Sequence, residues 1–160
     1  MTLDKKHLIN TIIMQLEQEL KNAINSAEMA RLAATDDQSV AETQYDTLGL
    51  EASYLAHGQS ERAEQIKIQI EQYQNLHIKD FDENDEVNIG CVVELLSSNA
   101  KKQYYFIGPC GGGLKIVAND MSIIVITPQT PLAKELIGKF QYDIISLPGN
   151  NQQMEIINLC

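Results

Sequence analysis

Carboxylates that could bind a divalent cation gather in one stretch of the sequence. The interval from Arg31 to Arg62 contains no Lys or Arg, and acidic residues crowd its first part. They are Asp36, Asp37, Glu42, Asp46 and Glu51. Like charges held close together repel, and a divalent metal ion or a basic pocket of a partner relieves that repulsion. The stretch therefore predicts a site for a metal ion or for a basic surface.

A structural explanation competes with this chemistry. Ser39 and Glu42 have the spacing of a capping box, in which each side chain accepts a hydrogen bond from the other residue's amide at a helix start. Asp36 or Asp37 can likewise satisfy amides in a turn and stabilise a helix N-terminus. For Glu42 alone, capping is the favoured explanation. Capping does not explain why so many carboxylates lack basic neighbours.

Two helices must position this stretch, because apolar residues recur on both sides of it at a spacing of about 3.5. The first stripe is Ile9, Ile13, Leu16, Leu20, Ala23, Ala27, Ala30 and Ala34, and the second is Tyr45, Leu48, Ala52, Leu55, Ala63, Ile66, Ile70 and Tyr73. A helix over residues 8–34 would be about 40 Å long. The short polar turn at residues 35–39 predicts an antiparallel coiled-coil hairpin over residues 1–78, slender where alanines line it. One interrupted helix is the alternative.

The spacing of apolar residues changes after residue 78. An acidic linker at residues 79–86 precedes alternating apolar residues at 87–95, which are typical of a half-buried strand. Further strands are predicted over residues 103–107, 114–117, 122–126, 144–147 and 153–159, with a short helix from Pro131 to Gly138. Residues 87–160 are therefore predicted to form a small antiparallel β domain with one short helix, which makes the whole chain α+β.

Composition limits the classes of function. The net charge of −10 disfavours non-specific binding of nucleic acid. No apolar run reaches the length of about 18 residues needed to span a membrane, and residues 1–7 lack the apolar segment of a secretory signal, so we expect a cytoplasmic protein. Cys91, Cys110 and Cys160 are far apart and the three histidines show no ligand spacing, so structural zinc is not expected.

Motifs of an independent enzyme are absent from the sequence. The glycine-rich run at residues 108–113 is not followed by Gly-Lys-Ser or Gly-Lys-Thr, which a phosphate-binding loop requires. There is no Gly-x-Ser-x-Gly motif, and no cysteine has a histidine nearby in the sequence. We therefore predict that the chain is not itself an enzyme.

Three stretches resemble the Gre transcript-cleavage factors. Residues 127–139 are similar to the Ser-Pro…Leu-x-Gly-Lys signature of that family, and residues 89–95 and 104–109 resemble its opening strands. Together with the hairpin, the resemblance covers nearly the whole chain. It implies an FKBP-like fold for residues 87–160, without prolyl isomerase activity, since the chain lacks Trp.

The resemblance also implies a partner and a reaction. Gre factors bind bacterial RNA polymerase, and their coiled coil passes through its secondary channel toward the catalytic Mg²⁺. There the polymerase itself cleaves the 3′ end of backtracked RNA. The resemblance implies a transcription elongation factor that would share Mg²⁺ with the polymerase and contact the RNA 3′ end. We expect a monomer, but the sequence leaves the oligomeric state open. It would activate another enzyme rather than act as one.

Individual residues receive roles from the same resemblance. The carboxylates expected to act in catalysis are Asp36, Asp37 and Glu42, those expected to bind metal are Asp37, Glu42 and Asp46, and the residues expected to contact the polymerase are Gln129, Thr130, Pro131 and Ile137.

The spacing of the acidic residues departs from the family pattern, which places an Asp and a Glu three residues apart. In an ungapped register these two positions fall on Gln38 and Ala41, whereas a one-residue shift brings Asp37 close to the expected Asp. Two other hypotheses therefore stay open. The chain could occupy the channel as a regulator without stimulating cleavage, or it could be a coiled-coil adaptor for a different protein.

Overall fold

The computed structural model describes residues 3–35, 47–118, 120–147, 149 and 152–160. The chain divides into two compact units. We call residues 13–71 the helical unit, and residues 1–12 together with 72–160 the sheet unit. The first helix contributes to both. The expected domain boundaries after residue 78 and before residue 87 stay a prediction.

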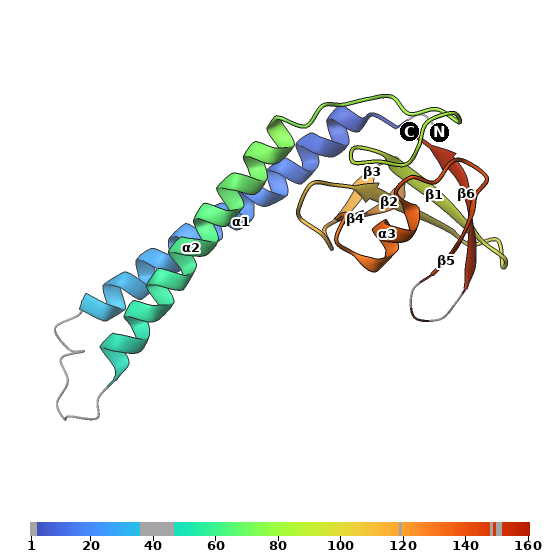
Figure 1. The fold of residues 1–160 in the computed structure, drawn as a ribbon. Helices are drawn as coiled ribbons and strands as arrows, with labels where there is room; N and C mark the ends of the chain where they lie inside the picture. Colours follow the sequence, from blue (N-terminus) through green and yellow to red (C-terminus); the bar gives the residue numbers. More distant parts are fainter. Residues whose placement is uncertain (1–2, 36–46, 119, 148, 150–151) are drawn as a thin grey trace. The chain divides into compact units, whose positions relative to one another are not determined.

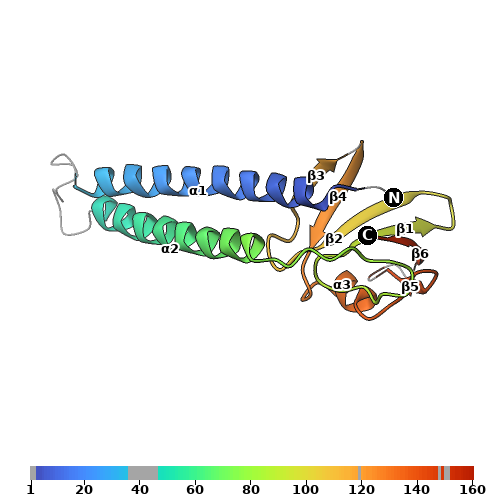
Figure 2. The same cartoon turned by 90° about the horizontal axis from the view of Figure 1, so that it is seen from above.

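Two long helices form the predicted hairpin. Helix α1 spans Lys5–Thr35 and helix α2 spans Leu48–Gln74, and Figures 1 and 2 both show them side by side. Because α2 returns along α1, a single interrupted helix is excluded. Within the part of the chain that the structure describes, no helix is long and apolar enough to cross a membrane.

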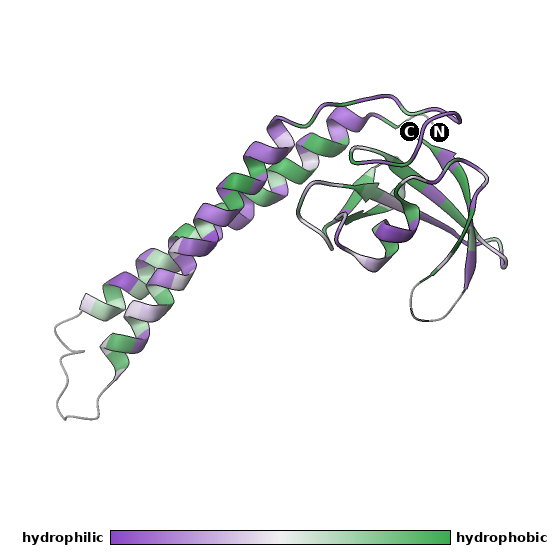
Figure 3. Cartoon of the chain, in the orientation of Figure 1, coloured by the Kyte–Doolittle hydropathy of each residue, from purple (hydrophilic) through white to green (hydrophobic). Residues whose placement is uncertain are grey.

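The seam of the hairpin follows heptad spacing on both helices. Its buried members on α1 are Ile9, Ile12, Leu16, Ala23 and Ala30, and on α2 they are Ala63, Ile66, Ile70 and Tyr73. Figure 3 shows hydrophobic and hydrophilic residues interspersed along both helices, as an amphipathic seam requires. Side chains on the seam become smaller toward the turn, as the sequence predicted.

The phase of α2 near the turn differs from the prediction. Leu48 and Leu55 were expected on the seam, but they are 67% and 56% exposed. The half-buried residues there are Gly49, Ala52 and Ala56. Small residues let two helix backbones approach closely. Gly49, Ala52 and Ala56 therefore pack against the alanines of α1 better than Leu48 and Leu55 would. Tyr45, also predicted on the seam, lies outside the described residues.

The sheet contains six strands in the order β3-β4-β2-β1-β6-β5. The strands are β1 (Val92–Ser97), β2 (Lys102–Ile107), β3 (Lys115–Ala118), β4 (Met121–Ile126), β5 (Ile144–Ser146) and β6 (Gln153–Leu159). All the predicted strands are present, and the predicted α+β class, a helical hairpin followed by a sheet with one short helix, is confirmed.

The sheet is mixed, whereas the sequence predicted an antiparallel one. Strand β2 pairs with β4 in parallel, with Phe106 opposite Val125. The reason is the position of β3. After β2 the chain forms the outer strand β3 first, and β4 then turns back antiparallel to β3 and enters between β3 and β2. A strand that returns twice runs in its original direction.

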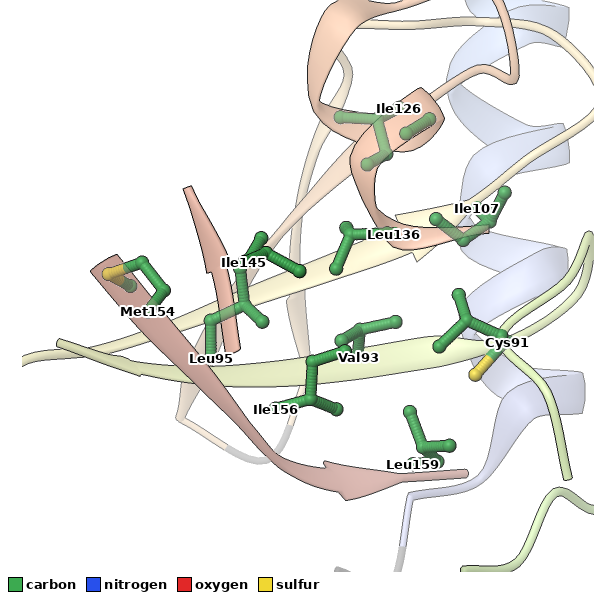
Figure 4. Packing of buried hydrophobic residues seen from close by; sticks show 12 residues of the cluster. Cys91, Val93, Leu95, Ile107, Ile126, Leu136, Ile145, Met154, Ile156 and Leu159 are labelled. Carbon is green, nitrogen blue, oxygen red and sulfur yellow. The ribbon is translucent and has the colours of Figure 1, made fainter. Parts of the chain in front are cut away.

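Strand β1 begins later than expected, and both of its faces are buried. The predicted strand started at residue 87, but Gly90 has a φ of 89° and the Cys91 amide donates to the Asn88 carbonyl at 3.1 Å, which makes a turn. Four of the six residues from Val92 to Ser97 form an uninterrupted buried run. Successive side chains of a strand point to opposite faces, so this run shows that both faces of β1 are covered. Figure 4 shows Val93, Leu136 and Ile156 pointing into one buried cluster.

The short helix α3 (Pro131–Leu136) was predicted correctly. The Thr130 hydroxyl accepts a hydrogen bond from the Ala133 amide at 3.3 Å and caps the N-terminus, and Pro131 occupies the first turn. Gly138 has a φ of 81°, the left-handed conformation expected just after a helix. Ala133 and Leu136 anchor the helix in the core of the sheet unit.

Candidate functional site

The predicted catalytic and metal-binding carboxylates join the two helices of the hairpin in the sequence. Asp36, Asp37, Glu42 and Asp46 lie outside the described residues. Their roles stay predictions, as does the capping box of Ser39 and Glu42.

The described end of this stretch shows what one carboxylate does. The Thr47 hydroxyl donates to Glu51 Oε1 at 2.9 Å, and the Glu51 amide donates to the Thr47 carbonyl at 2.8 Å. Glu51 also lies in the first turn of α2, where a negative charge interacts favourably with the helix dipole. Helix stabilisation therefore accounts for Glu51, which was predicted only as part of the acidic cluster.

The two arginines that bracket the acidic stretch both bind carboxylates elsewhere on the hairpin. The Arg31 guanidinium donates twice to Glu28, at 2.8 and 2.9 Å, and this hydrogen bonding lowers the pKa of the Glu28 carboxyl. The Arg62 guanidinium reaches across to Glu19 on the other helix at 3.2 Å. Each cation thus has a carboxylate partner outside residues 36–51.

The turn-side part of the hairpin, residues 23–35 and 47–59, exposes large apolar side chains. Those exposed are Ile24, Met29, Leu32, Leu48, Leu50, Tyr54 and Leu55. Such a surface suits contact with protein better than contact with the phosphates of nucleic acid, which need cations.

The residues predicted to contact the polymerase lie at the two ends of α3. Gln129 and Pro131 are exposed at its N-terminal end. Thr130 caps the helix and also donates to the Thr127 carbonyl at 2.8 Å, so a local structural role accounts for it. Ile137 is partly buried and packs against the core cluster, with its amide bonded to the Ala133 carbonyl at 2.9 Å. Of these four residues, Gln129 and Pro131 are therefore the ones most available to a partner.

The cysteine, histidine and acidic side chains of the described residues are the remaining candidates for metal binding and redox chemistry. Over residues 3–35, 47–118, 120–147, 149 and 152–160, no group of three His, Cys, Asp or Glu residues is placed to hold a metal ion. All three cysteines are free thiols. Burial raises the pKa of Cys91 to about 12, so this side chain behaves as a small apolar residue.

Sequence reasoning missed a buried carboxylate in the sheet. Glu94, on the central strand β1, accepts from Lys102 Nζ at 2.9 Å and from the Tyr104 hydroxyl at 3.2 Å. The hydrogen bond to Glu94 also raises the pKa of Lys102. A charged residue inside an apolar strand was the feature of the sequence that could have revealed this buried carboxylate. Its partners satisfy it, so Glu94 serves the fold.

A second missed contact joins the end of α2 to the glycine-rich loop. The Tyr73 hydroxyl donates to the Cys110 carbonyl at 2.7 Å, and burial raises the pKa of Tyr73. A Cβ on Gly108 would lie 2.4 Å from the Tyr73 hydroxyl oxygen. The loop therefore requires glycine at this position, because the Tyr73 hydroxyl and Val125 occupy the space that a Cβ would need.

Comparison with known proteins gives distant structural similarity only. No family model and no curated protein matches the sequence. Among solved structures, the chain is similar to GreA factor homolog 1 (Gfh1) of Thermus thermophilus, with 17% identity, a TM-score of 0.38, and 92% of this chain and 94% of that one covered. It is also similar to a structure described as the transcription factor Gfh1, with 19% identity and a TM-score of 0.40. A third similar structure is Thermus aquaticus Gfh1, with 17% identity and a TM-score of 0.37. In both cases 94% of this chain and 92% of the other chain are covered. These values are low, so the fold stated above depends on the chain's own elements.

Proposed function

We propose that the chain is a cytoplasmic transcription elongation factor that binds bacterial RNA polymerase and stimulates the polymerase's own cleavage of backtracked RNA. The observation that carries this proposal is the hairpin. Two helices that pack along each other are joined by a segment whose sequence contains Asp36, Asp37, Glu42 and Asp46. The resemblance of residues 127–139 to the Gre signature supports the same assignment.

The dimensions of α1 suit a helix that reaches into a larger enzyme. It has 31 residues without interruption, which corresponds to about 46 Å at about 1.5 Å per residue. The small seam residues Ala27, Ala30, Ala52 and Ala56 keep the turn-side part narrow. A thin and continuous pair of helices is what insertion through a channel requires.

The acidic residues would act together with Mg²⁺ in the polymerase's active site. Asp37, Glu42 and Asp46 would contribute ligands, and the bound ion would polarise the phosphate and activate water. The contribution of this chain is to deliver negatively charged oxygens near the RNA 3′ end, with Asp36, Asp37 and Glu42 as the acting carboxylates. The polymerase itself would catalyse the cleavage of the RNA.

A transcript-cleavage assay tests the proposal. Purified protein mixed with backtracked complexes and Mg²⁺ is expected to release short 3′ RNA fragments, and Asp37→Asn with Glu42→Gln is expected to abolish the release. A matched control is Asp120→Asn with Glu155→Gln, two exposed carboxylates of the sheet unit outside α3, which should leave release unchanged. No release at saturating wild-type protein would refute stimulation of cleavage.

The unusual acidic spacing favours a second candidate function. Gln38 and Ala41 occupy the positions where the family has its acidic pair in the ungapped register. The chain would then bind in the channel as a regulator or inhibitor without stimulating cleavage. In that case it competes with a genuine cleavage factor for the polymerase, and the Asp37→Asn, Glu42→Gln variant competes equally well.

A further inference from the structure

A groove in the sheet unit combines an apolar floor with acidic residues. It has a volume of about 650 Å³ and lies between the segment that follows α2 and Phe140. Leu76, Phe81, Ile89 and Phe140 supply apolar surface, and Asp85 and Glu86 supply carboxylates. Lys79 and His77 also line the groove. Neither the proposed polymerase contacts nor the acidic residues of the hairpin belong to it. We call it the acidic groove.

Hydrogen bonds hold the two walls of the acidic groove together. The Val87 amide donates to the Lys139 carbonyl at 2.8 Å, and the Gly138 amide donates to the Val87 carbonyl at 3.0 Å. Val87 is completely buried in the core cluster. Glu86 and Phe140 therefore follow directly from residues with fixed backbones, and the groove exists before any partner arrives.

Cations fix the ring of Phe81 at the groove. Lys5 Nζ lies 4.8 Å from the ring centroid, and Lys79 Nζ lies 5.3 Å from it. Lys5 also donates to the Lys79 carbonyl and is almost fully buried, while Lys79 pairs with Asp85. The ammonium groups of Lys5 and Lys79 are thus used internally.

The charge around the acidic groove is strongly negative. Five carboxylates lie in one short segment: Asp80, Asp82, Glu83, Asp85 and Glu86. Only Asp85 among them pairs with a lysine in the structure, and the sequence contains no Lys or Arg from residue 80 to residue 100. Because Lys79 in the lining pairs with Asp85, Glu86 is the lining carboxylate that remains for a partner's cation. The surrounding carboxylates disfavour phosphates.

Two large apolar side chains are only partly covered at this site. Ile89 is 40% exposed and Phe140 is 41% exposed, and both line the groove. Exposed aromatic and aliphatic side chains surrounded by polar residues are typical of protein contact surfaces, which have an apolar centre and a polar rim. An apolar side chain of a partner would cover them.

We propose that the acidic groove binds a peptide segment of a protein partner in which Lys or Arg stands next to a large apolar residue. The basic side chain pairs with Glu86 and the neighbouring carboxylates, and the apolar side chain packs on Ile89 and Phe140. Nucleic acid is disfavoured by charge. A second copy of this chain is disfavoured for the same reason, since its net charge is −10.

Nuclear magnetic resonance of the full chain, labelled with ¹⁵N, tests this proposal. The probe is the peptide acetyl-Gly-Leu-Arg-Lys-Leu-Phe-Arg-Gly-amide, and the control peptide has Glu in place of Arg and Lys. Saturable shifts are expected at the amides of Glu86, Ile89 and Phe140 with the basic peptide alone. Shifts confined to the hairpin, equal binding of the acidic peptide, or no binding would each overturn the proposal. So would shifts at the groove that depend on protein concentration without peptide, because they would identify a second copy as the occupant.

Variants provide the second half of the test. Glu86→Lys and Phe140→Ala should each lower the affinity for the basic peptide by more than about fivefold, as expected for residues central to an interface. Glu135→Lys changes an exposed carboxylate on α3 outside the groove and should leave the affinity unchanged. Equal affinities in all three variants would overturn the assignment to this groove.

Discussion

The turn-side part of the hairpin and the core of the sheet unit use side chains of very different size. In the sheet unit, residues such as Leu95, Leu136 and Ile156 are completely buried. On the turn side of the hairpin, the buried seam residues are Ala23 and Ala30, while Leu48 and Leu55 face solvent. Because burial of apolar area drives stability, we expect the core of the sheet unit to contribute more to stability than the turn-side part does. The turn-side part instead exposes apolar side chains that are available for contact with another protein.

Removing a leucine from each region gives the largest expected difference. Leu136→Ala in the sheet unit should lower the free energy of unfolding by about 2–5 kcal/mol, because it leaves a cavity in a close-packed core. Leu55→Ala, at an exposed position of α2, should change it by less than about 0.5 kcal/mol. Urea denaturation followed by circular dichroism measures both. Equal losses would mean that the hairpin buries Leu55 in solution, and the comparison would fail.

The contact between Tyr73 and Gly108 tests how closely the sheet unit is packed. A Cβ at residue 108 would lie 2.4 Å from the Tyr73 hydroxyl oxygen and 2.9 Å from Val125 Cγ1. Gly108→Ala should therefore destabilise the protein by about 1–3 kcal/mol. Adding Tyr73→Phe removes the nearer atom and should recover part of the loss in a double-mutant cycle. Strictly additive effects would show that the two residues do not interact.

A larger side chain on the seam tests how closely the two helices pack in the turn-side part. Ala30→Leu places a large side chain where the helices approach closely and should cost about 1 kcal/mol, since the seam can open toward solvent. Ala33→Leu, at an exposed position three residues away, is the matched control and should be nearly neutral. Thermal unfolding compares the two. If Ala30→Leu raised the melting temperature, the seam would be underpacked rather than close.

The smallest expected effect is a gain in stability. Gly58 lies in the interior of α2, and a Cβ built there meets no described atom within 4 Å other than its chain neighbours and the backbone of its own helix. Gly58→Ala should stabilise the hairpin by about 0.5–1 kcal/mol, because it restricts the unfolded chain and improves helix propensity. Amide hydrogen exchange in α2 should slow accordingly. Unchanged exchange would indicate that the alanine adds no stability to the hairpin.

Local patterns predicted the elements well because their signals are local. Heptad spacing gave both helices, and Thr130, Pro131 and Gly138 marked the ends of α3. The phase of α2 was missed because hydrophobicity favours Leu48 and Leu55, whereas close packing favours Gly49 and Ala56. The parallel pairing of β2 and β4 depends on contacts between distant residues, so no local pattern encodes it. The acidic groove was missed because Phe140 joins residues 76–89 only after folding.

The lengths of the outermost strands have a consequence for behaviour at high concentration. Strand β3 has four residues and β5 has three, whereas the inner strands have six or seven. Short borders offer few unpaired amides and carbonyls to a neighbouring molecule, which limits strand exchange and fibre growth. Lengthening β5 by redesign of the residues around it would test this protection, and light scattering would register the loss.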